Sequence, residues 1–451
     1  MNNNIPTEFI RHTKDLIGED ECKALVNAHE ANPPASIRVN EAKGFDVPAK
    51  SNRLLWSSNG YYLSERPSFT VDPLFHAGCY YVQEASSMFL EHVLKQLVKG
   101  PVTMLDLCAA PGGKSTLARS VLPEGSLLVA NEVVRSRAQV LAENMIKWGH
   151  DGVVVTNNDA KDFRRAGVMF DVVLTDVPCS GEGMFRKDEG ARAEWSVDNV
   201  SLCQQRQRRI VADIWDCLKP GGLLIYSTCT FNREENEDNV AWIATELGAE
   251  PVGIDIPDVW NITGNLVGSN FTVYRFLPHK TKGEGLFMAV LRKTSEDCIK
   301  PTRLKKDKLS TAFPKELKRW INIPDKYAYE LNGNLANAFP KQSYQHYLSL
   351  KSTLKIIHAG IILGEIKGKD WQPNHSLAMS TSLNADAFPT ANLSLEQSLS
   401  YLRSEAIVLD NSLPKGYVLL TYAHHPLGFA KNIGNRANNL YPNDWRIRKQ
   451  I

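Results

Sequence analysis

Two short stretches of the sequence place a cysteine beside residues that could support covalent catalysis. Cys179 follows Asp176 in "TDVPCSG", and Cys229 stands in "YSTCTF". An apolar run with the pattern of a buried strand precedes each stretch, so both thiols are expected at strand tips. A thiolate can add to an electrophilic carbon, and a nearby carboxyl group can stabilise the adduct through a hydrogen bond or proton transfer.

Two thiols and a carboxylate fit one reaction well, the methylation of a cytosine at C5. C5 is a poor nucleophile until a thiolate adds at C6 and turns the ring into an enamine. An acid at N3 or at the exocyclic amine stabilises the adduct, and proton loss at C5 followed by thiol expulsion completes the turnover. Asp176 fits the N3 role. One cysteine fits the attack and the other the release, and the spacing leaves open which is which.

The stretch "LDLCAAPGGKST", residues 105–116, is the candidate cofactor loop. Its Gly-Lys-Ser resembles a phosphate-binding loop, but such a loop needs a glycine where Cys108 stands, five residues before Gly113. An enzyme that hydrolyses a nucleoside triphosphate is therefore disfavoured. The loop also lacks the GxGxxG of hydride cofactors. Gly112 and Gly113 would let the backbone approach a ligand closely, with Asp106 nearby.

Acidic residues follow the next two strands and favour a nucleoside cofactor. Glu132 ends the second strand, where a carboxylate commonly binds both ribose hydroxyls. Asp159 ends the third strand and is placed to reach the base. Each acid alone could be a helix cap or a solvated loop residue, but three acids on three strand ends favour an adenosine-containing cofactor.

The elements that must position these residues alternate between strands and helices from about residue 101 to 295. Such alternation predicts an α/β fold with a mostly parallel, doubly wound, Rossmann-like sheet, with the ligand beyond the carboxyl ends of the strands. The predicted strands cover residues 102–108, 126–133, 152–159, 170–179 and 221–231, and the predicted helices between them include 114–122 and 135–149. Residues 7–30 also show helical apolar spacing, and shorter strands and helices are expected after residue 310.

The composition is that of a globular protein, with 43% hydrophobic and 23% charged residues and a net charge of +2. We find no secretory leader and no apolar run long enough for a membrane span, so a cytoplasmic protein is expected. The eight cysteines form no CxxC pair, and no metal site is expected. Lysine and arginine gather in residues 301–320 and 427–451. These clusters are either solvated surface or contacts to a phosphate backbone.

A series of motifs resembles the Sun-type (NSUN-type) RNA 5-methylcytosine methyltransferases. In chain order the matching stretches are "SIRVN" (36–40), "YVQEASSM" (81–88), "DLCAAPGGKS" (106–115), "NE" (131–132), "NDA" (158–160), "DVPCSGEGMFRKD" (176–188), "QQRQ" (204–207), "YSTCTFNREENE" (226–237) and "RFLPHKTKGEGLFMAVLRK" (275–293). The match covers roughly residues 30 to 295 in order. The series is specific, although each motif alone would be modest evidence.

The resemblance implies S-adenosylmethionine as cofactor and assigns roles to residues. It implies that Cys229 is the nucleophile and that Cys179 helps to release the product, with Asp176 at the reacting base. A resemblance to DNA cytosine methyltransferases would imply the opposite assignment, in which the cysteine of the Pro-Cys motif, here Cys179, is the nucleophile. The implied cofactor contacts are Cys108, Ala109, Ala110, Pro111, Gly112, Gly113, Lys114, Glu132, Asp159 and Asp176.

The C-terminal part resembles the bacterial F-type 16S rRNA cytosine-C5 methyltransferases, because "HPLGFAK" and "GNRANNLYPNDWRI" within residues 425–447 are similar to the end of their PUA-like module. This resemblance implies an N-terminal α+β RNA-binding or cap region (1–98), a methyltransferase domain (99–296), a connecting domain (297–380) and a PUA-like RNA-binding module (381–451). We expect a monomer that methylates ribosomal RNA or the small subunit. A tRNA cytosine-C5 methyltransferase and a non-catalytic ribosome-assembly factor are the alternatives.

Overall fold

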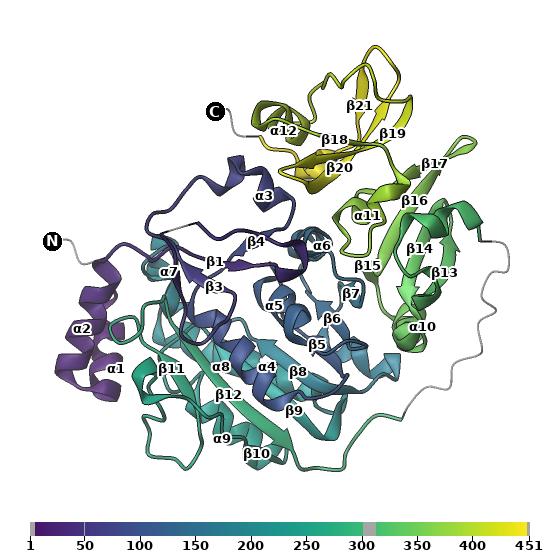
Figure 1. Cartoon of the computed structure of the whole chain (residues 1–451). Helices are drawn as coiled ribbons and strands as arrows, with labels where there is room; N and C mark the ends of the chain where they lie inside the picture. The colour runs from purple at the N-terminus through teal and green to yellow at the C-terminus, as the bar shows by residue number, and fades with distance from the viewer. Residues whose placement is uncertain (1–4, 49, 301–312, 449–451) are drawn as a thin grey trace.

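The computed structural model describes residues 5–48, 50–300 and 313–448 (Figure 1). Among these residues the central sheet has nine strands, in the order β10-β12-β9-β8-β5-β6-β7-β15, with β11 paired to β12. Its parallel strands are β5 (Thr103–Asp106), β6 (Leu127–Asn131), β7 (Val153–Thr156), β8 (Phe170–Asp176) and β9 (Leu218–Thr228). Its antiparallel strands are β10 (Ala249–Pro251), β11 (Tyr274–Phe276), β12 (Leu286–Lys293) and β15 (Ile356–Ala359).

Helices cover both faces of this sheet because its strands are apolar on both sides. Met104 and Leu105 are adjacent in β5 and pack into two different hydrophobic clusters. On one face lie α4 (Leu90–Leu97), α5 (Gly113–Val121) and α6 (Arg135–Trp148). On the other lie α8 (Val197–Trp215), α9 (Glu237–Glu246) and α10 (Tyr344–Thr353). The α/β class with a doubly wound, mostly parallel sheet is confirmed.

The N-terminal part carries two helices and a small antiparallel sheet. The helical pattern of residues 7–30 is divided into α1 (Thr7–Ile17) and α2 (Glu19–Glu30), because Gly18 takes a left-handed φ of 86°. The sheet has the order β2-β3-β1-β4, and its strands are β1 (Ser36–Val39), β2 (Asn52–Arg53), β3 (Gly60–Tyr62) and β4 (Tyr80–Val82). The short helix α3 (Pro73–His76) lies between β3 and β4 in the chain.

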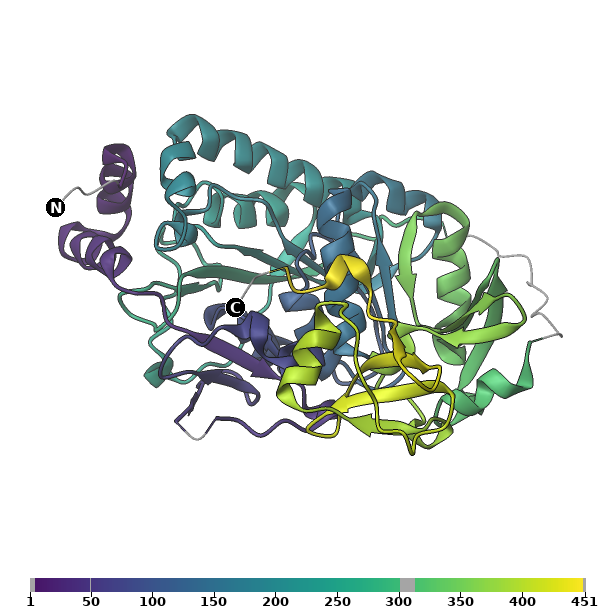
Figure 2. The same ribbon diagram turned by 90° about the horizontal axis from the view of Figure 1, so that it is seen from above.

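The C-terminal part contains two further sheets. The first pairs β13 (Tyr327–Asn332), β14 (Leu335–Pro340), β16 (Ile361–Lys367) and β17 (Asp370–Pro373). The second pairs β18 (Thr390–Asn392), β19 (Gly416–Tyr422), β20 (His425–Asn432) and β21 (Ala437–Asn439). Two helices, α11 (His375–Met379) and α12 (Leu395–Leu402), accompany them. The helices α1 and α2 lie at the opposite end of the molecule from β13 and β14 in both ribbon views (Figures 1 and 2).

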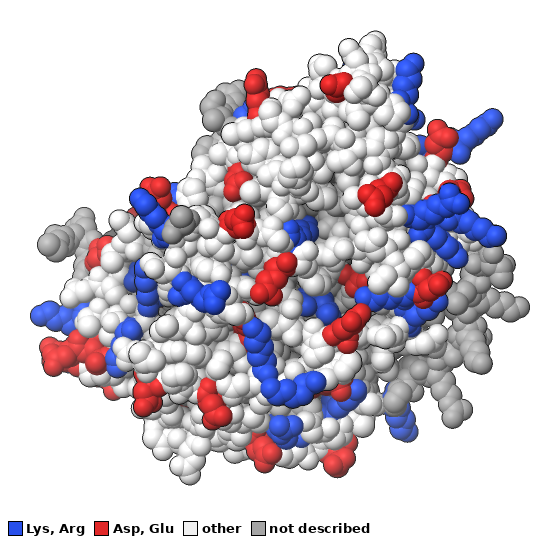
Figure 3. Space-filling view, in the orientation of Figure 1, with Lys and Arg blue, Asp and Glu red and all other residues white. Residues whose placement is uncertain are grey.

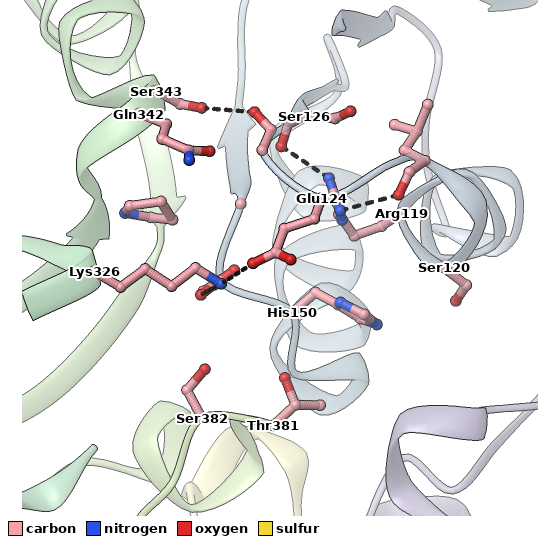
Figure 4. Close-up of a pocket in the computed structure, with 15 residues that line it drawn as sticks. Arg119, Ser120, Glu124, Ser126, His150, Lys326, Gln342, Ser343, Thr381 and Ser382 are labelled. Carbon is pink, nitrogen blue, oxygen red and sulfur yellow. Dashed lines mark hydrogen bonds and ion pairs between the residues drawn. The ribbon is translucent and has the colours of Figure 1, made fainter. Parts of the chain in front are cut away.

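The C-terminal part is joined to the central sheet by more than its linker. Strand β15 pairs with the edge strand β7. Beside this pairing, Lys326 lies 3.3 Å from Glu124, and Tyr327 donates a hydrogen bond of 2.5 Å to Asp151. Glu124, Asp151 and Lys326 line a pocket of about 260 Å³, which Figure 4 shows between the loops of the sheet and the C-terminal elements. The pocket lies at the amino ends of the strands, away from the cysteine tips.

Charged residues of both signs are interspersed over the face shown in Figure 3. Of the first basic cluster, residues 301–312 lie outside the described residues. In the second cluster Arg436, Arg446 and Arg448 are exposed, whereas Lys431 is half-buried over the ring of Tyr417. No helix within the described ranges is long and apolar enough to span a bilayer.

Candidate active site

The structure brings the two predicted cysteines into contact. Strands β8 and β9 are parallel neighbours with Asp176 paired to Ser227, so both cysteines follow the same edge of the sheet. The Sγ atoms of Cys179 and Cys229 are 3.2 Å apart, and both cysteines are free and half-buried. The contact and the burial both raise the pKa of Cys179. One thiol can therefore donate its S–H to the other.

A cavity of about 600 Å³ opens at these tips. It is lined by the predicted residues Cys108, Ala110, Glu132, Asp159, Asp176, Cys179 and Cys229. The remaining predicted cofactor contacts, Ala109, Pro111, Gly112, Gly113 and Lys114, are not among the lining residues. They belong to the turn that precedes α5 and to the first turn of α5.

Lys114 reaches the site through Asp176. Its Nζ lies 2.8 Å from Oδ2 of Asp176, while Ser227 donates a 2.8 Å hydrogen bond to Oδ1 of the same carboxylate. Burial is the largest influence and lowers the pKa of Lys114, but the charge and the hydrogen bond of Asp176, with smaller contributions from Cys229 and Asp106, together raise it above the usual value. The carboxylate is therefore held at both oxygens beside the two thiols.

The turn before α5 is fixed from two sides. Gly112 has a φ of 114°, and a Cβ there would lie 3.3 Å from Leu141, so a side chain is strained by the backbone and crowded by α6. From the N-terminal sheet, the buried Arg38 donates to Thr116 at 2.6 Å and to the Gly113 carbonyl at 3.4 Å. The N-terminal part thus helps to shape the cofactor loop.

Asp106, which the sequence places near the ligand, does not itself line the cavity. Its carboxyl group is fully buried and accepts a 2.6 Å hydrogen bond from Ser115. Burial raises the pKa of Asp106 to about 7. Its position favours a role in holding the first turn of α5 over direct contact with a ligand.

Glu132 and Asp159 lie on the cavity wall, as expected for residues that hold a nucleoside. Glu132 is buried, accepts a 2.8 Å hydrogen bond from the Val134 amide and lies 3.5 Å from Arg137. Asp159 caps a short helical turn through the Lys161 amide. Carboxylates at two strand ends beside apolar walls at Val134 and Ile210 fit a ribose with an attached base.

Several lining residues lie outside the predicted site residues. They are Asn131, Val133, Val134, Arg137, Asn158, Met184, Ile210 and Asp213, among others. Asn131 is the last residue of β6 and Asn158 follows β7, so the rule that polar residues at strand ends face the ligand would have found both. The α8 residues gave a weaker signal, because helical spacing does not say which face opens on a cavity.

Phe185, Trp195 and Arg208 follow the Cys179 tip in the sequence but do not line the cavity. Phe185 and Trp195 are buried in a cluster with Phe9, at ring distances of 5.0 and 5.7 Å. Arg208 donates to Asn239 at 2.8 Å instead of reaching the cavity. These aromatic side chains therefore stabilise the protein core instead of guiding a substrate.

Three family models match the chain in order. They are the N-terminal domain of 16S rRNA methyltransferase RsmF at residues 5–85, 16S rRNA methyltransferase RsmB/F at 96–292, and the methyltransferase RsmF PUA domain at 388–447. The second match contains every lining residue of the cavity named above. The matches confirm the resemblance drawn from the motifs.

Curated relatives match over nearly the whole chain. Ribosomal RNA small subunit methyltransferase F of Aliivibrio salmonicida is 30% identical over 91% of this chain and 90% of its own length. The protein of the same name from Cronobacter sakazakii is 32% identical over 86% of this chain and 83% of its own.

Solved structures share the fold of the central part. A methyltransferase homologue from Pyrococcus horikoshii is 27% identical, with a TM-score of 0.55 over 64% of this chain and 96% of its own. NSun6 from the same organism, solved with SFG, is 20% identical, with a TM-score of 0.56 over 65% of this chain and all of its own. With the family models and the near full-length relatives, this likeness leads to one conclusion: the chain belongs to the 16S rRNA methyltransferase RsmB/F family.

Proposed function

We propose that this protein transfers a methyl group from S-adenosylmethionine to C5 of a cytosine in 16S rRNA. The observation that carries the proposal is the thiol pair of Cys179 and Cys229, 3.2 Å apart beside the carboxylate of Asp176 in one cavity. Methylation of adenine or of a small molecule needs no such pair. The 16S rRNA substrate follows from the names of the relatives that match over most of the chain.

The cavity residues fit the cofactor by their chemistry. Glu132 would accept hydrogen bonds from the ribose hydroxyls, and Asp159 would reach the base. Asp106, through Ser115, would hold the helix turn against the charged end of the ligand. When bound, S-adenosylmethionine supplies an electrophilic methyl group to the carbon opposite it.

The residues of the chain prepare the cytosine for this transfer. The thiolate of Cys229 adds to C6, and the π electron pair of the C5=C6 double bond moves to C5, which makes C5 nucleophilic. Asp176, oriented by Lys114 and Ser227, binds the N3 edge of the ring and stabilises the adduct. After methylation a base removes the C5 proton, the C5=C6 double bond re-forms, and the C6–S bond breaks with its electron pair leaving on sulfur. Cys179 lies at the departing sulfur and assists this release.

A variant of the nucleophile tests the proposal. We expect Cys229→Ala to abolish methylation of 16S rRNA, by more than about a thousandfold, because no thiol is left at the attacking position. Binding of S-adenosylmethionine, measured by calorimetry, should survive because the carboxylates expected to hold the nucleoside, Glu132 and Asp159, are unchanged. The assay follows labelled methyl groups into small-subunit RNA and maps them by bisulfite sequencing. Full activity of this variant would exclude Cys229 as the nucleophile.

A second variant separates attack from release. We expect Cys179→Ala to accumulate a covalent protein–RNA adduct, because Cys229 still adds to C6 while release is slowed. The adduct would appear as a slower band on a denaturing gel and would disappear in the double variant that also lacks Cys229. If RNA and cofactor give no such band, Cys179 does not act in release.

A further inference from the structure

A cluster of buried polar side chains lies behind the two cysteine tips and has no part in the mechanism above. We call Glu182, Gln207, Asn232 and Glu235 the carboxyl cluster. Glu182 and Glu235 are 1% and 0% exposed. Two buried carboxyl groups cost free energy unless hydrogen bonds compensate for lost hydration, so their partners show what they hold.

Glu235 holds the tip that carries Cys179. Its carboxylate accepts a 3.0 Å hydrogen bond from the amide of Ser180, the residue after Cys179. It also accepts 2.6 Å from Nε2 of Gln207, which donates at 3.0 Å to the carbonyl of Pro178. The backbone on both sides of Cys179 is therefore attached to Glu235, directly or through one amide.

Glu182 holds the tip that carries Cys229. It accepts hydrogen bonds from the Phe231 and Asn232 amides at 2.5 and 3.0 Å, and the next residue, Gly183, donates at 2.7 Å to the carbonyl of Cys229. The side-chain amide of Asn232 joins the two halves, with 2.9 Å to Glu182 and 2.8 Å to Glu235. The separation of the sulfur atoms is thus fixed by this cluster.

The charges around the two thiols differ in sign. Lys114 stands near Cys229. A thiolate at Cys229 would attract the ammonium group of Lys114 and raise the pKa of the lysine. Glu235 stands behind Cys179, and its negative charge adds to the contact with Cys229 and the burial that raise the pKa of Cys179. Burial and the nearby Glu182 raise the pKa of Glu235 to about 7, so its charge develops around neutral pH.

We propose that Glu235 is a positioning residue that divides the roles of the two thiols. Its carboxylate fixes the Cys179 tip and keeps Cys179 in the S–H form that can donate to the departing sulfur, which leaves Cys229 as the nucleophile. The division into attack and release rests on the proposed function. The unequal reactivity of the two neighbouring thiols can be measured without RNA or cofactor.

The test follows alkylation of each cysteine against pH by peptide mass spectrometry. The wild-type protein should react first at Cys229. In Glu235→Gln the negative charge behind Cys179 is lost, so the pH midpoint for alkylation of Cys179 should fall. The alkylation rate of Cys179 at pH 8 should rise about threefold or more, because a fall of one pKa unit raises the thiolate fraction up to tenfold. The plateau rate at high pH should stay the same, since a loosened tip would raise the plateau and leave the midpoint in place.

Two variants serve as controls. Glu235→Asp keeps the negative charge and should return the Cys179 midpoint toward that of the wild type. Glu234→Gln removes the same charge from the neighbouring, partly exposed residue and should leave both cysteines unchanged.

Two results would overturn the inference. One is a folded Glu235→Gln protein with an unchanged Cys179 midpoint. The other, which needs no variant, is faster alkylation of Cys179 than of Cys229 in the wild type. Failure to methylate 16S rRNA would instead count against the proposed function, because alkylation reports the thiols whatever the substrate is.

Discussion

Asp106 shows at the scale of a residue how burial changes a carboxyl group. It has no exposed surface, and one of its oxygens has no hydrogen-bond partner among the described residues. The single bond from Ser115 offsets only part of the lost hydration, so the pKa rises from 3.8 to about 7. The folded protein therefore binds a proton at Asp106 over a pH range in which the unfolded chain has released it.

This proton uptake gives a pH dependence with a definite sign. Because the folded-state pKa is raised, stability falls as pH rises from about 4 to about 7, by about 1 kcal/mol per pH unit. Asp106→Asn removes this titration. The free energy of unfolding of the variant should therefore increase relative to that of the wild type as pH rises from about 4 to about 7. Denaturant unfolding at pH 5, 6, 7 and 8 measures the difference. A difference that stays constant with pH would show that Asp106 titrates as an exposed carboxyl group does.

Gly149 shows how an element end sets the contact between two parts of the chain. It ends α6 with a φ of 88°, and its carbonyl accepts a 3.0 Å hydrogen bond from Thr381. A Cβ at this position would lie 2.2 Å from the carbonyl oxygen of Met379. The last turn of α6 and the end of α11 can therefore approach each other only because residue 149 has no side chain.

We expect Gly149→Ala to destabilise the protein by more than the conformational term alone. The left-handed backbone costs an alanine about 1 to 2 kcal/mol, and displacement of α11 adds to this. Gly333→Ala is a matched control, because Gly333 has a φ of 57° with no atom within 4 Å of a Cβ. Thermal unfolding of both variants measures the contrast. Equal losses would mean that α11 moves aside without cost.

The whole molecule does not divide at the linker that follows the methyltransferase region. Strand β15, far along the chain, completes the edge of the central sheet beside β7. Truncation after about residue 298 would expose that edge, so it would lower stability as well as RNA binding. The RNA-binding role of the C-terminal module is better tested by substitutions on its surface.

Exposed arginines near the C-terminus allow that test. We expect the triple variant Arg436→Ala, Arg446→Ala and Arg448→Ala to bind ribosomal RNA more weakly, with a salt dependence reduced by about two to three counterions. Fluorescence anisotropy at several salt concentrations measures both quantities. The control is Lys367→Ala with Lys369→Ala, two exposed cations outside the PUA match and outside both basic clusters. An unchanged salt slope in the triple variant would mean that these arginines are solvated surface.

Much of the site could be predicted from the sequence because its signals are local. Apolar runs ending in Asp176, Cys179 and Cys229 indicate strands with reactive tips, and the carboxyl ends of parallel strands meet at one edge. Glu132 and Asp159 follow from the same rule. No local signal assigns the roles of the two cysteines. That assignment comes from the resemblance to a family and remains a proposal.

The sequence by itself determined the fold class, the strand tips and the reactive residues on them, since apolar period and residue type are read along the chain. Tertiary structure decided the 3.2 Å contact of the thiols, the burial of Asp106 and the cluster around Glu235. It also decided that Phe185 and Trp195 are buried in the core and that β15 pairs with β7 at the edge of the central sheet. The physical reason is that burial and charge proximity depend on segments distant in sequence, which no local pattern records.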